Sequence, residues 1–255
     1  MGRVLYIHPV NGVDAELEAY LQGIKGPGTE LTMSVLERAP QHLEYYYYGT
    51  LVQADVVHRV LWAEREGYDA AILGCFYDPG LREAREVASR IVVMAPAESS
   101  LHLASMLGHR FSVLVGRRKW IPGMLDNVVR YGLASKLASF RPLGLGVLEF
   151  HQDPQLTARR LEEEARKAIA EDGAEVIVLG CTMQYGFFRE LQEKLGVPVI
   201  DPLVASVKMA ELFIDLRERF GWLPSKAGEY ESPPLVEMAS WRLPLTYGVE
   251  ALWRS

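Results

Sequence analysis

Short runs of Val, Ile and Leu recur along the chain and alternate with longer stretches whose apolar residues return every three or four positions. The short runs predict β-strands, and several lack a polar–apolar alternation, which is typical of parallel strands covered on both faces. The expected strands are 4–7, 30–35, 70–73, 90–94, 111–115, 143–149, 175–179 and 197–200. Because strands and helices alternate, the sequence predicts an α/β fold with doubly wound parallel sheets.

Capping residues mark where several helices begin and end. The pair Asp153-Pro154 predicts a helix start, since Asp is a common N-cap and Pro fits the first helical position, and Gly173 predicts that helix's end. The pair Asp78-Pro79 predicts another start, with Asp78 as N-cap, and Gly108 predicts the end of a third helix.

The chain also repeats itself. A shift of 106 positions places residues 67–106 on 173–212 without a gap, with nine identities in forty positions. They include Leu73-Gly74-Cys75 on Leu179-Gly180-Cys181, and therefore both of the chain's only cysteines; a similar shift places 3–7 on 110–114. We expect two pseudo-symmetric doubly wound parallel-sheet domains with the active site between them: 1–97 plus 206–255, and 98–205.

Composition narrows the class of protein. The 255 residues are 49% hydrophobic, and 27 basic against 33 acidic side chains give a formal charge of −6, which disfavours nucleic acid as a partner. No apolar run is long enough to span a membrane, and the first residues do not resemble a signal peptide. We therefore expect a cytoplasmic protein with a small-molecule partner. The six histidines show no metal-type pairing, so no metal is expected.

Each cysteine follows an apolar strand and a glycine, at the strand end where open α/β sheets bind ligands. A helix starting there would lower the pKa of the thiol toward neutrality. Two equivalent halves would place the sulfurs of Cys75 and Cys181 on opposite sides of one cleft, as proton removal and delivery on opposite faces of a carbon require. The alternative is that both cysteines only pack in the core; a disulfide is not expected in a reducing compartment.

Several neighbours of the cysteines are candidate substrate-binding residues. Phe76 and Tyr77 begin a turn whose N–H groups are expected to point into the cleft. The Thr182 hydroxyl could bind a substrate oxygen or cap a helix. Asn11 follows the first strand as a substrate ligand or as part of a plain turn. The remaining candidates are Met183, after the second cysteine, and Glu98 and Ser99, in the loop after strand 90–94.

Four stretches resemble the Asp/Glu/hydantoin racemase superfamily, and most of all its hydantoin racemase branch. They are GYDAAILGCFYDPGLREAREV (67–87), HRFSVLVG (109–116), EDGAEVIVLGCTM (171–183) and LGVPVIDPLVASVKMAE (195–211). The resemblance implies a racemase or epimerase that needs no cofactor, with Cys75 and Cys181 as its acid/base thiols. It also implies a pseudo-symmetric two-domain fold with the site between the halves, in a homo-oligomer.

Departures from the family bear on the substrate. The usual Asn-Pro-Asn-Thr-like loop is replaced by residues 8–11, His-Pro-Val-Asn, and Phe76 and Met183 stand where relatives acting on free Asp or Glu have Asn and His. These changes favour an apolar or cyclic amide substrate, such as a 5-substituted hydantoin. The alternatives are an Asp/Glu-type amino-acid racemase, a sibling decarboxylase or cis–trans isomerase, and a non-catalytic protein that binds a small ligand.

The last stretch, 221–255, lies outside the repeat. It holds Trp222, Trp241 and Trp253, more aromatic side chains than a disordered tail would carry. We expect it to pack against the body of the protein, as a lid over the cleft, a subunit contact or a stabilising strap.

Overall fold

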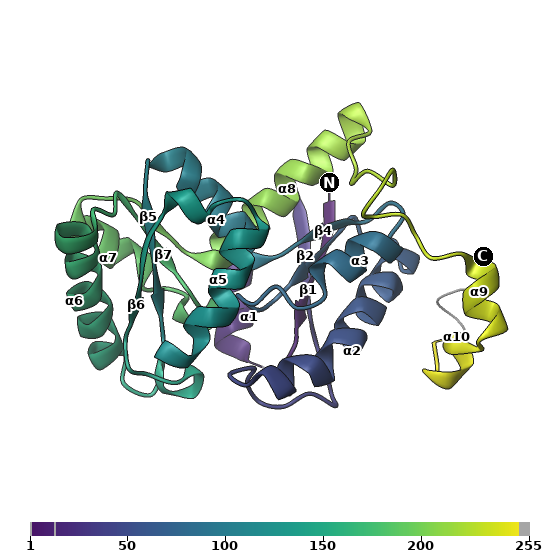
Figure 1. Cartoon of the computed structure of the whole chain (residues 1–255), viewed down its shortest axis with the longest axis horizontal. Coiled ribbons are helices and arrows are strands. Elements are labelled where there is room, and N and C mark those ends of the chain that lie inside the picture. Colours follow the sequence, from purple (N-terminus) through teal and green to yellow (C-terminus); the bar gives the residue numbers. More distant parts are fainter. Residues whose placement is uncertain (1, 13, 250–255) are drawn as a thin grey trace.

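Two four-stranded parallel sheets form the framework of the computed structural model, which describes residues 2–12 and 14–249 (Figure 1). The first sheet has the order β2-β1-β3-β4, and the second repeats this order as β6-β5-β7-β8. The strands are β1 (Gly2–His8), β2 (Thr29–Val35), β3 (Ala70–Leu73), β4 (Val92–Met94), β5 (Phe111–Val115), β6 (Leu137–Pro142), β7 (Val176–Leu179) and β8 (Val199–Ile200). The α/β fold and the similarity of its two halves are thus confirmed.

One expected strand is wrong. Residues 143–149 form a loop that ends in a 3-10 turn at Val147–Glu149, and the sixth strand is Leu137–Pro142. This strand lies at the edge of the second sheet and is only partly buried, so it carries polar side chains instead of an apolar run. One of them, Arg141, forms an ion pair with Asp172 at 2.7 Å. Edge strands of this kind are hard to predict from a sequence. One edge and part of their surface are exposed to solvent, so they carry polar side chains and lack a continuous apolar run.

Helices cover both sheets. They are α1 (Ala15–Ile24), α2 (Tyr46–Arg65), α3 (Leu81–Val87), α4 (Pro96–Leu107), α5 (Ile121–Arg130), α6 (Pro154–Asp172), α7 (Phe188–Leu195), α8 (Pro202–Phe220), α9 (Leu235–Ser240) and α10 (Leu243–Thr246). The predicted ends of α6 are confirmed: the Asp153 carboxylate accepts from the N–H of Leu156, and Gly173 ends the helix in the left-handed conformation. Gly108 ends α4 as expected. No helix in the described part of the chain is long and apolar enough to span a membrane.

The helix that follows the last strand of each sheet packs on the other sheet. Helix α4 follows β4 of the first sheet, yet its Ala97, Leu101 and Ala104 lie in the buried cluster of the second sheet. Helix α8 follows β8 of the second sheet, and its Leu203 and Val207 pack on the first sheet. This exchange is compatible with domains that meet near residues 97 and 206, which we retain as a proposal.

Asp78 caps a different helix from the one expected. Helix α3 begins only at Leu81, and its N-cap is Gly80. The buried Asp78 carboxylate accepts from the N–H groups of Ala97 (2.9 Å) and Glu98 (2.8 Å), at the first turn of α4. Tyr131 donates its hydroxyl to the same carboxylate at 2.6 Å. Asp78 therefore joins the loop after Cys75 to a helix that covers the second sheet.

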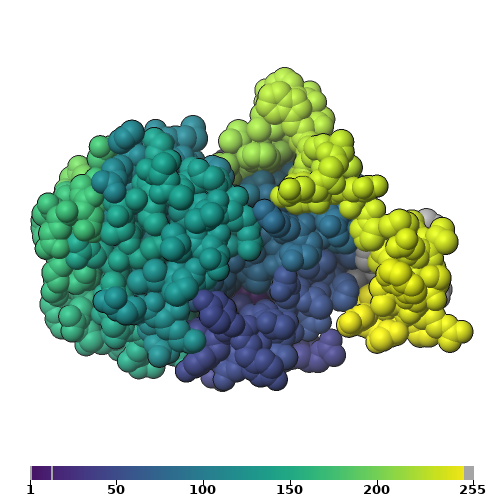
Figure 2. All heavy atoms as spheres, viewed as in Figure 1, coloured from purple at the N-terminus to yellow at the C-terminus, as the bar shows by residue number. Residues whose placement is uncertain are grey.

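The C-terminal segment, residues 221–249, packs along the outer side of α3. The Lys226 ammonium donates to the carbonyls of Arg85 and Glu86, and the Ser232 hydroxyl also donates to Glu86. Figure 2 shows α9 and α10, in yellow, at the periphery of the molecule. Trp222 and Trp241 are each 63% exposed, and Trp253 lies outside the described residues. A subunit contact of this segment stays a prediction.

Candidate active site

A glycine ends β3 and β7 in the same way, one residue before each cysteine. The Gly74 N–H donates to the Ile7 carbonyl and the Gly180 N–H to the Leu114 carbonyl, both at 2.8 Å. A Cβ on either glycine would lie 2.7 Å from that same carbonyl oxygen. Only glycine lets the chain pass this close to the neighbouring strand. The backbone therefore leaves both sheets with the same geometry, one residue before each cysteine.

Both thiols line one cavity of about 410 Å³, which we call the thiol cavity. Its walls come from loops at the carboxyl ends of strands of both sheets, as expected for open α/β folds. The described lining residues are His8, Pro9, Val10, Asn11, Gly12, Asp14, Ala15, Glu16, Gln41, His42, Leu43, Gly74, Cys75, Val147, Leu148, Cys181, Thr182 and Met183. The repeat therefore brings its two cysteines to one shared cavity.

The environment of the thiols corrects the expected direction of their titration. Burial raises the pKa of Cys75 and of Cys181 to about 12, although hydrogen bonds from the Tyr77 and Met183 backbones lower it in part. No α-helix begins at either cysteine: Cys75 opens a turn, and Cys181 precedes a three-residue 3-10 turn. The sulfurs thus lack a helix dipole strong enough to offset desolvation. Both cysteines are free thiols, and they are protonated at neutral pH.

Three predicted substrate-binding residues line the thiol cavity. Asn11 does so with its side-chain amide donating to the carbonyl of Glu37 at 3.0 Å. Thr182 lines the cavity beside Cys181, and its hydroxyl donates to the Gly74 carbonyl at 3.3 Å. Met183 follows, and its carbonyl lies 2.9 Å from the His151 ring.

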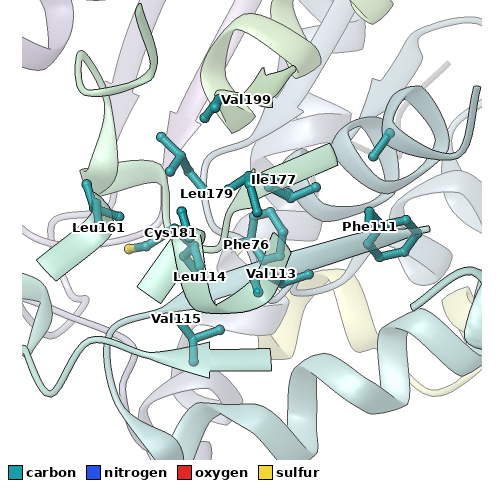
Figure 3. Packing of buried hydrophobic residues seen from close by; sticks show 14 of the residues in the cluster. Phe76, Phe111, Val113, Leu114, Val115, Leu161, Ile177, Leu179, Cys181 and Val199 are labelled. Atoms are coloured by element: carbon teal, nitrogen blue, oxygen red, sulfur yellow. The ribbon is translucent and has the colours of Figure 1, made fainter. Parts of the chain in front are cut away.

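Phe76 and Tyr77 do not line the thiol cavity. The Phe76 side chain is 3% exposed and lies among Val113, Leu114 and Ile177 in the core of the second sheet (Figure 3). Tyr77 borders a neighbouring hollow, and its carbonyl accepts from the Asn127 amide at 2.8 Å. These aromatic side chains anchor the Cys75 loop to the opposite half, so only their backbone groups remain near the thiol.

Glu98 and Ser99 lie in a separate cavity of about 470 Å³, between α3, α4, α8 and the C-terminal segment. The Glu98 carboxylate is paired with the guanidinium of Arg85, whose Nη1 donates to it at 2.8 Å. These two residues lie on the side of α4 that faces this cavity, whereas Ala97, Leu101 and Ala104 pack on the second sheet. The structure therefore does not bring these two residues together with Cys75 and Cys181.

His8 is a cavity residue that the candidate set lacks. Its side chain is buried, and burial lowers the pKa of the imidazole to about 4, so that the ring is neutral near pH 7. Its Nδ1 has no hydrogen-bond partner among the described residues. The position of His8, directly after an expected strand, is the signal that could have identified it. In the described ranges, no group of three or more His, Cys, Asp and Glu side chains is arranged to hold a metal ion.

Comparisons with known proteins show which family the chain resembles. The family model described as Asp/Glu/hydantoin racemase matches residues 13–210. The chain is 39% identical to a hydantoin racemase of Pseudomonas sp. (strain NS671) over 210 residues, 82% of each chain. It is 35% identical to a hydantoin racemase of Paenarthrobacter aurescens over 235 residues, 91% of this chain and 97% of the relative.

A solved structure has a similar fold. An allantoin racemase from Klebsiella pneumoniae superposes with a TM-score of 0.84 at 29% identity, covering 92% of this chain and 94% of the other. The family model and the relatives each span most of the sequence, including both cysteines. The chain therefore belongs to the Asp/Glu/hydantoin racemase family and is a racemase, an isomerase.

Proposed function

We propose that this racemase inverts the C5 centre of a 5-substituted hydantoin or a related cyclic amide, with Cys75 and Cys181 as the two acid/base groups. The observation that carries the proposal is that the two thiols, one from each sheet, line a single cavity. The relatives named as hydantoin and allantoin racemases support the choice of ring, since allantoin is itself a hydantoin with a ureido group at C5.

In the proposed reaction, one cysteine as thiolate takes the C5 proton, and the bonding pair of the C–H bond moves into the ring to form an enolate. The other cysteine, as thiol, then gives its proton to C5 from the opposite face and becomes the thiolate. The roles exchange for the other enantiomer, so no proton is consumed overall. We assign the backbone N–H groups of Phe76 and Thr182 as donors to the enolate oxygen.

The proposed reaction starts from the state with one thiolate and one thiol, which is a small fraction of the protein at neutral pH because both pKa values are raised. Burial raises the pKa of Cys181, and a charge on Cys75 raises it further. Ionising both sulfurs is therefore costlier than ionising one, as for other like-charged pairs that share a site. This repulsion supports a state with one base and one acid, which two-base racemisation requires. No cofactor takes part in the proposed reaction.

The cavity walls support a neutral ring over a free acidic amino acid. Asp14 and Glu16 line the cavity, and no Lys or Arg stands among its described lining residues. A substrate carboxylate would then lack a cationic partner, which is costly in a partly buried space. The apolar side chains of Val10, Leu43 and Leu148 suit the C5 substituent of a hydantoin.

Proton NMR in deuterated water tests the proposal. The panel contains hydantoins with alkyl, aryl and ureido groups at C5, together with free aspartate and glutamate. The wild type is expected to deuterate C5 of hydantoins with loss of optical rotation, whereas Cys75→Ala and Cys181→Ala should not racemise them. Racemisation that survives in either variant, or exchange confined to the free amino acids, would refute the proposal.

A further inference from the structure

A buried tyrosine that takes no part in the proposed proton transfers contacts the backbone next to Cys75. Tyr6 belongs to β1, is 0% exposed and packs in the core of the first sheet. It is not among the lining residues of the thiol cavity. Its hydroxyl donates to the Gly74 carbonyl at 3.3 Å. Gly74 directly precedes Cys75, so the phenol contacts the backbone that carries the first thiol.

The same carbonyl accepts a second hydrogen bond, and this one comes from the other half of the molecule. The Thr182 hydroxyl also donates to Gly74 at 3.3 Å, and Thr182 directly follows Cys181. A carbonyl oxygen has two lone pairs and can accept both bonds. One oxygen atom thus connects the backbone segments of the two thiols, with one donor from each half of the molecule.

The fit around Gly74 shows how closely Tyr6 is held. A Cβ at Gly74 would lie 2.6 Å from both the hydroxyl oxygen and Cζ of Tyr6. In the second half the repeat places Val113 at the position of Tyr6, and Val113 Cγ1 lies 2.9 Å from a Cβ built on Gly180. The two halves share this packing, but only the first half has a hydroxyl there.

We propose that Tyr6 is a positioning residue: its hydroxyl, with that of Thr182, holds the Gly74 carbonyl and thereby fixes the position of the Cys75 thiol relative to the Cys181 thiol. The inference rests on the proposed two-thiol reaction. Tyr6 acts only through the backbone in this proposal, because it does not line the thiol cavity. Since Val113 cannot make the equivalent bond, the Cys75 side has a polar support that the Cys181 side lacks.

Tyr6→Phe removes the hydroxyl and keeps the ring that fills the core. Misplacing a reacting group by about 1 Å can cost about 100-fold in rate, so losing one of two bonds to Gly74 is expected to lower kcat about tenfold. KM should change less than about twofold, because uniform binding of the substrate is untouched. The matched control is Tyr20→Phe, which removes a hydroxyl that donates to Asp201 at 2.7 Å, outside the Gly74 contact.

Solvent exchange gives a readout that a loss of stability alone would not move. In deuterated water the wild type should place deuterium in the product before it appears in the remaining substrate. If Tyr6→Phe displaces one thiol, the enolate waits longer for a proton on the opposite face, and deuterium in recovered substrate rises relative to product. Tyr6→Phe combined with Thr182→Val should lower kcat by less than the product of the single effects, since both hydroxyls act on one carbonyl.

Alkylation keeps the inference testable if no substrate of the panel reacts. The relative rates at which iodoacetamide modifies Cys75 and Cys181, followed by mass spectrometry, should change in Tyr6→Phe and stay unchanged in Tyr20→Phe. Equal kcat, exchange pattern and alkylation ratio in Tyr6→Phe and wild type would overturn the role of Tyr6. A wild type that racemises no hydantoin would overturn the proposed function instead, while the alkylation ratio still decides on Tyr6.

Discussion

Raising the pH should increase the alkylation rate of both thiols in proportion to the fraction that is ionised. The burial of the thiols in the structure determines how small that fraction is at pH 7. Burial raises the pKa of each thiol to about 12, against about 8.5 for a free cysteine. At pH 7 the thiolate fraction is then about 3000-fold smaller than for an exposed cysteine. A more basic thiolate is more nucleophilic. With a Brønsted coefficient near 0.45, this pKa difference makes each thiolate react about 40-fold faster than the thiolate of free cysteine. Alkylation of either cysteine should therefore be about 80-fold slower than that of free cysteine at pH 7.

The assay is the second-order rate constant for iodoacetamide, measured from about pH 7 to about pH 10. Each thiol is followed by itself in Cys75→Ala or Cys181→Ala, with free cysteine as reference. Both rate constants should rise about tenfold per pH unit over the whole range, since the titration midpoint lies above it.

A plateau below about pH 9 would refute the assignment of burial as the dominant effect, because it would report a thiol with an ordinary or lowered pKa. The same dependence should hold for kcat/KM of the free enzyme, which rises with pH as the required thiolate forms. Agreement of the two slopes would identify the titrating group in catalysis as a thiol.

Two further predictions concern the backbone at Cys75 and the contact between the halves. Gly74→Ala should lower the free energy of unfolding in urea by about 1–3 kcal/mol, because a Cβ there would lie 2.6 Å from Tyr6 and 2.7 Å from the Ile7 carbonyl. Gly23→Ala in α1, where nothing lies within 4 Å, should instead stabilise the protein by about 0.5 kcal/mol, and equal effects would contradict the steric account. Burial alone would raise the pKa of Glu44, but hydrogen bonds from the Arg117 guanidinium (2.7 Å) and the Val147 N–H (3.0 Å) outweigh it and lower that pKa. A lowered pKa means stability that is lost as the pH falls through the folded value, so acid titration from about pH 6 to about pH 3 should destabilise the wild type more than Glu44→Gln, and parallel stability curves would contradict this.

Much of the fold was readable from the sequence because buried parallel strands carry continuous apolar runs. β3 and β5 lie at the expected residues, and the repeat pointed to two similar halves. The edge strand β6 is not marked by the sequence pattern, because all six of its residues are only partly buried and they form no continuous apolar run. The family, too, was recognisable from short stretches around the cysteines.

The candidate site was less readable, since it depends on contacts between distant residues. Asp78 caps α4 and not its own helix, which no local pattern indicates. Glu98 lines a different cavity from the thiols, because the opposite side of α4 packs on the second sheet. The titration of the thiols also depends on how much protein surrounds them, and the sequence holds no measure of that desolvation.

The exchange of α4 and α8 has a mechanical consequence. The described chain passes between the two sheets only near Ala95 and Asp201, just before each exchanged helix begins. Two such connections restrict the relative motion of the halves more than one connection would, and a rotation about the line that joins them strains both connections least. The chain is arranged like two half-length subunits that exchange their last helices. Since one thiol belongs to each half, a rotation of this kind would change the distance between the two sulfurs.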